Sequence, residues 1–167
     1  MKYLSSIAYG SLDLAFVSAP DRFPAGIQMR PVSREPMLFV CRSDHHLAQR
    51  DQIGIAELGN DDLISLPSEF GLQRIINDSF AAVGVVPHMP YEAIADYSFA
   101  AVLVRNGLGS VFMPASDANR FPDLRAVPVR PAIDWRVFLA TAERQLAPAS
   151  AKLAELVIAS ADESATP

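Results

Sequence analysis

The chain alternates short apolar runs with segments of helical periodicity, and this pattern restricts the fold more than any other feature. The apolar runs that predict strands are Leu12–Val17, Ile27–Val32, Met37–Arg42, Asp62–Leu66, Pro90–Ile94, Gly109–Pro114, Leu124–Val129 and Trp135–Thr141. The segments that predict helices are residues 2–9, Leu72–Val83, Asp96–Asn106 and Pro148–Ser160, with a further short helix starting near Gly54. Such alternation at short spacing predicts an α/β fold with parallel sheets covered by helices.

Turn and cap residues mark the ends of these helices. The apolar residues of Leu72–Val83 lie on one helical face, and Gly84 follows as the predicted stop. Asp96 is placed to cap the next helix, and Gly107 to end it. Leu12–Val17 carries one charge in an apolar run, which predicts a buried parallel strand.

Composition indicates a folded protein of one domain or two small lobes. The 167 residues are 50% hydrophobic with a net charge of -5, and the 14 Lys and Arg residues are scattered singly. This argues against a nucleic-acid-binding surface, since such a surface needs clustered basic residues. A single cysteine excludes an intramolecular disulfide, and no run of residues reads as a signal peptide or a membrane span. The expected location is the cytoplasm.

Prolines mark two passages, at residues 31–36 and 128–131, where the chain is predicted to cross between lobes. We expect lobe I at about residues 1–34 and 131–160, and lobe II at about residues 35–130. A cleft between two lobes is the usual position of a ligand site in such an arrangement.

The segment FVCRSDHHLAQ, residues 39–49, concentrates reactive side chains. It contains the sole cysteine, Cys41, and two histidines, His45 and His46, beside Asp44. A zinc site needs four ligands at workable spacing, and the third histidine, His88, is far off in sequence. A Cys–His nucleophile pair lacks an evident orienting group. The segment is therefore predicted to be a strand end and a turn, with no metal, no cofactor and no catalytic residue.

The order of several segments carries a family resemblance. These segments are GSLDLAFV, PVSREPMLFVCRSDHHLAQ, DDLISLPSEFGLQRIINDSFAAVGVVP, AVLVRNGLGSVFMPAS and LAPASAKLAEL. Together they resemble the effector-binding domain of LysR-type transcriptional regulators over about residues 10–158. The family's turn reads Asp-His-Pro-Leu-Ala, whereas residues 44–48 read DHHLA, with His46 in the proline position. The resemblance implies a two-lobed, periplasmic-binding-protein-like (type 2) fold of mixed sheets flanked by helices.

Two parts of the family pattern are not found in this sequence. One is the N-terminal helix-turn-helix domain with its linker helix, and the other is the first strand, first helix and second strand of the effector domain. The first lobe is therefore expected to be truncated, with an uncovered sheet edge or apolar face. The chain is then either a fragment or one that borrows a surface from a partner.

The resemblance also implies a site for a small-molecule effector between the lobes. Its expected residues are Ser18, Ala19, Pro20, Pro67, Ser68, Glu69, Phe70, Gly71, Asp96, Tyr97 and Ser98. Free backbone amides at helix starts bind carboxylates. The hydroxyls of Ser68 and Ser98 add hydrogen bonds, and the ring of Phe70 or Tyr97 could pack against the ligand. Glu69 would repel an anion. For Ser68 and Asp96 the alternative is a helix cap, and for Phe70 a hydrophobic staple.

The predicted function is a ligand-sensing regulatory domain that binds a small, carboxylate-bearing metabolite and controls transcription without catalysis. The resemblance implies a homodimer that contacts DNA only through a domain absent from this sequence, and no membrane. Leu72–Val83 and Asp96–Asn106 are its candidate dimer surfaces. The alternatives are a solute-binding protein for uptake, a small α/β enzyme that uses Cys41, His45 and Asp44, and a partner-binding remnant.

Overall fold

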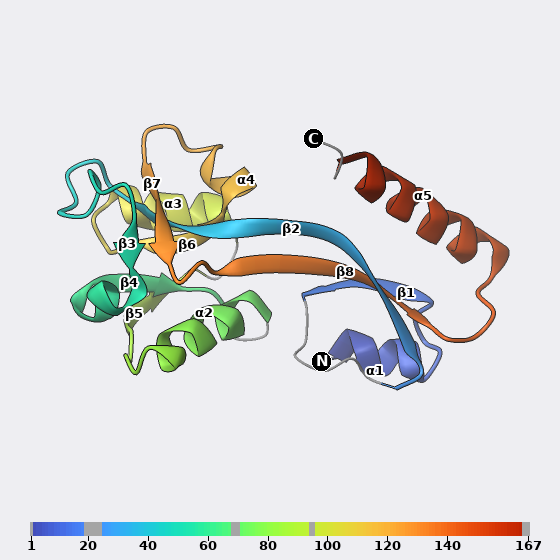
Figure 1. Cartoon of the computed structure of the whole chain (residues 1–167). Helices are drawn as coiled ribbons and strands as arrows, with labels where there is room; N and C mark the ends of the chain where they lie inside the picture. Colours follow the sequence, from blue (N-terminus) through green and yellow to red (C-terminus); the bar gives the residue numbers. More distant parts are fainter. Residues whose placement is uncertain (1, 19–24, 68–70, 94–95, 165–167) are drawn as a thin grey trace. The chain divides into compact units, whose positions relative to one another are not determined.

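The computed structural model describes residues 2–18, 25–67, 71–93 and 96–164 (Figure 1). The chain divides into two compact units, residues 1–34 with 136–167 and residues 35–135, here named unit 1 and unit 2. It passes from unit 1 to unit 2 within strand β2, Ile27–Cys41, and returns within strand β8, Asp134–Ala142. None of the described helices is long and apolar enough to cross a bilayer.

Unit 1 is a small sheet with one helix on each face. It holds α1 (Lys2–Ala8), β1 (Leu14–Ser18), α5 (Pro148–Ser164) and the neighbouring parts of β2 and β8. β1 pairs antiparallel with β8, which lies between β1 and β2 in the sheet. α1 covers one face, where Ile7, Ile27 and Ala140 form the buried centre of a small core.

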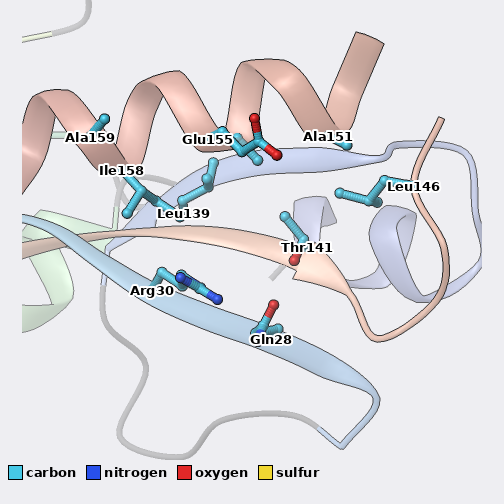
Figure 2. Close-up of a pocket in the computed structure, with 10 residues that line it drawn as sticks. Gln28, Arg30, Leu139, Thr141, Leu146, Ala151, Glu155, Ile158 and Ala159 are labelled. Atoms are coloured by element: carbon cyan, nitrogen blue, oxygen red, sulfur yellow. The ribbon is translucent and has the colours of Figure 1, made fainter. Parts of the chain in front are cut away.

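Helix α5 lies over the opposite face of that sheet and is poorly covered. None of its side chains at positions 148–161 is buried, and Leu153 and Leu156 are 49% and 57% exposed. A cavity of about 390 Å³ separates it from the sheet, with Leu139 and Thr141 of β8 among the lining residues (Figure 2). Unit 1 therefore presents an apolar helix whose burial is incomplete.

Unit 2 contains the larger core, built on the end of β2. β2 pairs antiparallel with β6 (Val111–Pro114) and with β7 (Arg125–Arg130). β7 also pairs, in parallel, with the short strand β3 (Ile53–Gly54). In a separate sheet, β4 (Asp62–Ser65) and β5 (His88–Glu92) are parallel neighbours. Unit 2 therefore contains both parallel and antiparallel pairs of strands, and its helices pack on these sheets.

The helices of unit 2 cover its sheets, and α2 buries the apolar face that its sequence predicts. They are the 3-10 helix η1 (Ile55–Asn60) and the α-helices α2 (Gly71–Ala82), α3 (Tyr97–Arg105) and α4 (Ala115–Ala118). Phe80 of α2 is fully buried and meets Phe112 edge to face with ring centroids 6.0 Å apart. Phe112 in turn meets Phe39 of β2 at 6.1 Å. This aromatic stack is the centre of the core.

Several sequence predictions were wrong in detail. Leu12–Val17 was expected to be a buried parallel strand, but β1 is antiparallel to β8 and only half-buried, with Phe16 53% exposed. The predicted strands on either side of residues 33–36 form one 15-residue strand, β2. Pro31 and Pro36 lie in this strand before the residues that pair with β6 and β7, which begin at Met37. Because proline lacks a backbone N–H, this position spares the hydrogen bonds of those two ladders. β3 and α4 were not predicted.

Candidate functional site

The described members of the predicted effector set in unit 2 follow one edge of the β4–β5 sheet; they are Pro67, Gly71, Asp96, Tyr97 and Ser98. The two strands run parallel, and the amide of Ala93, just after β5, donates to the Ser65 carbonyl at the end of β4, at 2.9 Å. The chain then leads from β4 to α2 and from β5 to α3. The carboxyl ends of neighbouring parallel strands lie at the same edge of a sheet, so the chain enters α2 and α3 from the same edge.

Asp96 is the N-cap of α3, as the sequence predicted. Its backbone is extended, with φ -156°, and its carboxylate accepts a hydrogen bond from the Phe99 amide at 2.9 Å. The cap satisfies one free amide of the helix and places a negative charge at its positive end. This amide is therefore already occupied, and Ser98 beside it is exposed.

Tyr97, the first residue of α3, is the unusual member of the predicted set. Its ring packs against both hydrophobic clusters of unit 2. Its hydroxyl is buried and has no hydrogen-bond partner among the described residues. Burial raises the pKa of the phenol far above its ordinary value, and the nearby carboxylates of Asp117 and Glu35 raise it further. The hydroxyl is therefore a neutral donor that still lacks an acceptor.

The remaining predicted residues divide into described and undescribed positions. Ser18 ends β1 in unit 1, where it is half-buried opposite Val137. Pro67 is buried just after β4, and Gly71 is the exposed first residue of α2. The predicted residues that lie outside the described part of the chain are Ala19, Pro20, Ser68, Glu69 and Phe70. Whether any of these positions binds a ligand stays a prediction.

Cys41 lies where a structural role was predicted, at the end of β2. Its side chain is fully buried, and burial raises the pKa of the thiol to about 11. A thiol that stays protonated and shielded from solvent is a poor nucleophile. The structure therefore gives no support to an enzyme built on Cys41, His45 and Asp44, particularly because Asp44 binds Arg42 through two hydrogen bonds of 2.6 and 2.8 Å.

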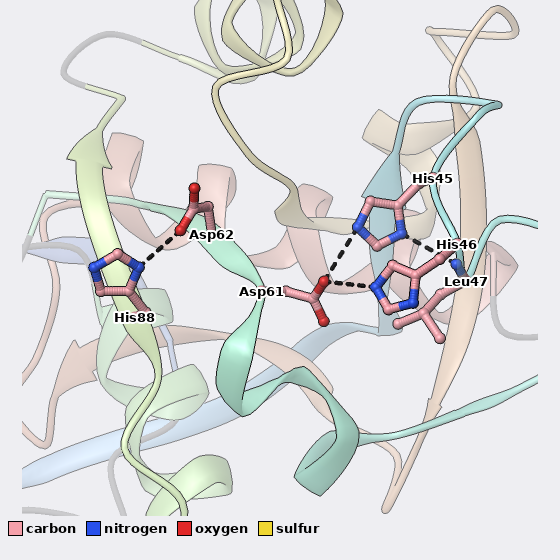
Figure 3. A network of polar contacts seen from close by, with 6 residues as sticks. All are labelled: His45, His46, Leu47, Asp61, Asp62 and His88. Atoms are coloured by element: carbon pink, nitrogen blue, oxygen red, sulfur yellow. Dashed lines mark hydrogen bonds and ion pairs between the residues drawn. The ribbon is translucent and has the colours of Figure 1, made fainter.

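The histidines of the turn, in contrast, lie beside a third group that can bind a metal, which was not predicted from the sequence. Asp61, at the end of η1, places one carboxylate oxygen 3.3 Å from Nε2 of His45 and 2.8 Å from Nε2 of His46 (Figure 3). The separation of 15 residues between His46 and Asp61 matches no simple ligand spacing. The sequence therefore offered no signal for this three-residue cluster.

A further cavity of about 350 Å³ lies beside this turn, with Arg42, His45 and Ser110 among its lining residues. Gly107 and Gly109 also line it, from the loop between α3 and β6. Both glycines have positive φ values, 75° and 141°, and Gly107 follows α3 as its predicted stop. Backbone geometry thus explains why glycine stands at both positions.

Comparison with other proteins finds relatives of this chain among regulators. The profile of the LysR substrate binding domain matches residues 2–162. The chain is 30% identical over 109 residues to the HTH-type transcriptional regulator ShiR of Corynebacterium glutamicum, which covers 64% of this chain and 36% of ShiR. It is 30% identical over 122 residues to the small neutral protease regulatory protein of Streptomyces coelicolor, with coverages of 70% and 36%. The chain thus spans about a third of the length of these relatives.

Solved structures show the same fold at lower identity. The effector binding domain of QuiR in complex with shikimate superposes with a TM-score of 0.81 at 21% identity, over 97% of this chain and 78% of that one. The regulatory domain of CcmR from Synechocystis PCC6803 in complex with 2-PG gives 0.80 at 18%, over 95% and 77%. These structures confirm the periplasmic-binding-protein-like fold of mixed sheets and helices. Because the family profile also spans nearly all of the sequence, this chain belongs to the LysR substrate-binding domain family.

Proposed function

We propose that this chain is the sensing domain of a LysR-type transcriptional regulator and binds a small metabolite that carries hydroxyl groups and a carboxylate. Control of transcription would pass through a DNA-binding domain outside this sequence. The family membership supports a regulatory role, and it disfavours the alternative of a solute-binding protein for uptake. The solved relative that binds shikimate, a hydroxylated carboxylic acid, supports the chemical class.

The observation that carries the proposal is the hydroxyl of Tyr97. A buried polar group without a partner costs about 1–3 kcal/mol, so proteins rarely keep one without a reason. Tyr97 lies at the start of α3 and is one of the residues at which we expect the effector. An acceptor atom of a bound metabolite would form the missing hydrogen bond. The free energy recovered in this way would add to the affinity for the metabolite.

The charges near Tyr97 favour hydroxyl groups on that side of the ligand. Glu35 and Asp117 are close enough to raise the pKa of the phenol. Glu35 accepts a hydrogen bond from the Ser116 amide at 2.8 Å, and Asp117 accepts one from Arg120 at 2.9 Å. Carboxylates accept hydrogen bonds from hydroxyls and repel anions. We therefore expect the ligand's own carboxylate to point away from Tyr97.

The test is the substitution Tyr97→Phe, which removes the hydroxyl and keeps the ring. Shikimate serves as the probe in calorimetric titration, with its methyl ester as the uncharged analogue. We expect Tyr97→Phe to leave the free protein equally stable or more stable, since an unsatisfied group is lost, while binding weakens at least fivefold. Tyr91→Phe is the matched control, because Tyr91 is 42% exposed on β5.

Opposite results would refute the role of Tyr97. If Tyr97→Phe destabilises the free protein and leaves affinity unchanged, the hydroxyl is structural and the proposed site is wrong. Absence of binding by shikimate and by other hydroxylated acids, in a protein shown to be folded by circular dichroism, would reject the sensing function itself.

We also propose that the domain works as a homodimer. The outer face of α3 exposes Phe99 and Val102, which are 39% and 46% accessible, and α5 exposes Leu153 and Leu156. Exposed apolar residues that share a helix face are typical of interfaces. Light scattering after size exclusion should show a dimer that Val102→Glu or Leu156→Glu weakens. A monomer at all concentrations would reject this part of the proposal.

A further inference from the structure

The chain holds a cluster of metal-binding side chains that the sensing function does not use. His45 and His46 follow β2, and Asp61 lies between η1 and β4. One potential ligand atom from each residue lies within 4.8 Å of the other two (Figure 3). We propose that His45, His46 and Asp61 bind a divalent transition-metal ion of the zinc class.

The chemistry of the donors supports this class of ion. Two imidazole nitrogens and a carboxylate oxygen suit Zn²⁺, Co²⁺, Ni²⁺ and Cu²⁺ better than Mg²⁺ or Ca²⁺, which prefer oxygen ligands. Three protein ligands also leave a position open for water. A site of this kind differs from the four-ligand structural zinc site that the sequence analysis considered.

The distances are close to those that coordination requires. Zinc bonds of about 2.0–2.1 Å in a tetrahedron place ligand atoms roughly 3.3 Å apart. The Asp61 oxygen is already 3.3 Å from Nε2 of His45. It is 2.8 Å from Nε2 of His46, so that pair must separate by about half an ångström. Because the His46 side chain is 64% exposed, its ring is free to make this adjustment.

Burial and exposure divide the site into a fixed part and an open part. The side chains of Asp61 and His45 are only 12% and 20% exposed, and the His45 ring packs edge to face on Phe39 with centroids 5.5 Å apart. His46 faces solvent, which gives an ion a path of entry. The His45 and His46 rings lie 4.5 Å apart, so a small rotation brings both nitrogens to one ion.

Two existing hydrogen bonds must change when the ion binds. One joins Nε2 of His46 to the Asp61 carboxylate at 2.8 Å, and coordination of both groups replaces it. The Leu47 amide donates to Nδ1 of His45 at 3.2 Å, which places the imidazole proton on Nε2. Coordination through Nε2 moves that proton to Nδ1 and breaks the Leu47 bond. The Leu47 bond is long and local, and three coordinate bonds form in place of the two hydrogen bonds, so the exchange favours the metal.

His46 is also the position at which this chain departs from the related turn, where proline stands. A proline there would remove the third ligand of this cluster. The metal site is therefore a property of this sequence and not one carried by the shared fold.

The experiment uses the untagged full chain, freed of metal by chelator and titrated with Zn²⁺ in calorimetry. Co²⁺, whose visible absorption reports coordination geometry, is the second probe. We expect one equivalent to bind and the thermal midpoint to rise with it. His46→Ala, His46→Pro and Asp61→Asn should each weaken binding at least tenfold. Circular dichroism of the metal-free variants checks that they fold.

His88→Ala is the matched control. Nδ1 of His88 lies 2.7 Å from Asp62, so this variant removes an exposed His–carboxylate pair that has no second imidazole (Figure 3). Its affinity should stay within twofold of the unsubstituted chain. The proposal is overturned if the chain binds no stoichiometric Zn²⁺. It is also overturned if His88→Ala weakens binding as much as His46→Ala, or if His46→Ala has no effect.

Discussion

Replacement of Gly109 by alanine tests how closely two backbone segments of unit 2 approach each other. Gly109 has φ +141°, and a Cβ there would lie 2.6 Å from the Asp62 carbonyl oxygen, closer than real Cβ contacts allow. The approach is fixed by hydrogen bonds on either side. The Ser110 amide donates to the Asp62 carbonyl at 2.9 Å, and the Ile64 amide donates to the Ser110 carbonyl at 2.7 Å.

The cost follows from these contacts. Backbone strain at a φ reserved for glycine costs about 1–3 kcal/mol. If the clash pushes the strands apart, two hydrogen bonds are weakened, each contributing about 0.5–1.5 kcal/mol. We therefore expect Gly109→Ala to lower the free energy of unfolding of unit 2 by about 4 kcal/mol, which combines the middles of those ranges. For a chain of this length that corresponds to a fall in the thermal midpoint of roughly 8–16 °C.

Gly84→Ala separates strain from clash. Gly84 has φ +72°, and a Cβ there meets nothing within 4 Å, so the cost is strain alone, about 1–2 kcal/mol. Urea unfolding followed by the fluorescence of Trp135 reports on unit 2, because this single tryptophan packs against its core. If the free energies of unfolding of the two variants differ by less than about 1 kcal/mol, the two hydrogen bonds are not weakened as expected. The close approach of Gly109 to Asp62 would then not explain the cost.

The remaining predictions concern the core, a cap and a buried thiol. Phe80→Ala should lower the free energy of unfolding by about 3–5 kcal/mol in urea titration, since it empties a fully buried position against Phe112; a cost near 1 kcal/mol would mean that the aromatic stack is loose. Asp96→Ala should cost about 1 kcal/mol and Asp96→Asn much less, measured the same way, because only the alanine loses the bond to the Phe99 amide. The pKa of the Cys41 thiol is raised to about 11, so the folded state holds its proton longer than the unfolded chain does. The contribution of this group to stability is complete below about pH 8.5 and is lost as the pH rises towards 11. The free energy of unfolding, measured at pH 8, 9 and 10, should therefore fall with pH, and Cys41→Ala should reduce this fall. An equal fall in both proteins would contradict the raised pKa.

Local chemistry made part of this structure predictable from the sequence. The apolar residues of positions 72–83 recur every three or four positions, which predicts a helix with one apolar face. Helix α2 buries Leu72, Ile76 and Phe80 on that face. Gly84 and Gly107 end helices with positive φ, and Asp96 caps α3, as their residue types predict. Each of these features depends on neighbours within one or two turns of the chain, so a short stretch of sequence contains the whole cause.

Strand partners and side-chain clusters needed the tertiary structure. The direction of β1 is decided by β8, more than 100 residues later, and nothing inside Leu12–Val17 specifies it. That the Tyr97 hydroxyl is buried without a hydrogen-bond partner among the described residues became visible only when the surrounding side chains were in place. Asp61 meets the two histidines because η1 ends beside the turn that follows β2. A sequence determines which groups a chain carries and how its nearest neighbours constrain them, whereas packing alone decides which distant groups meet, and both proposed binding sites depend on such meetings.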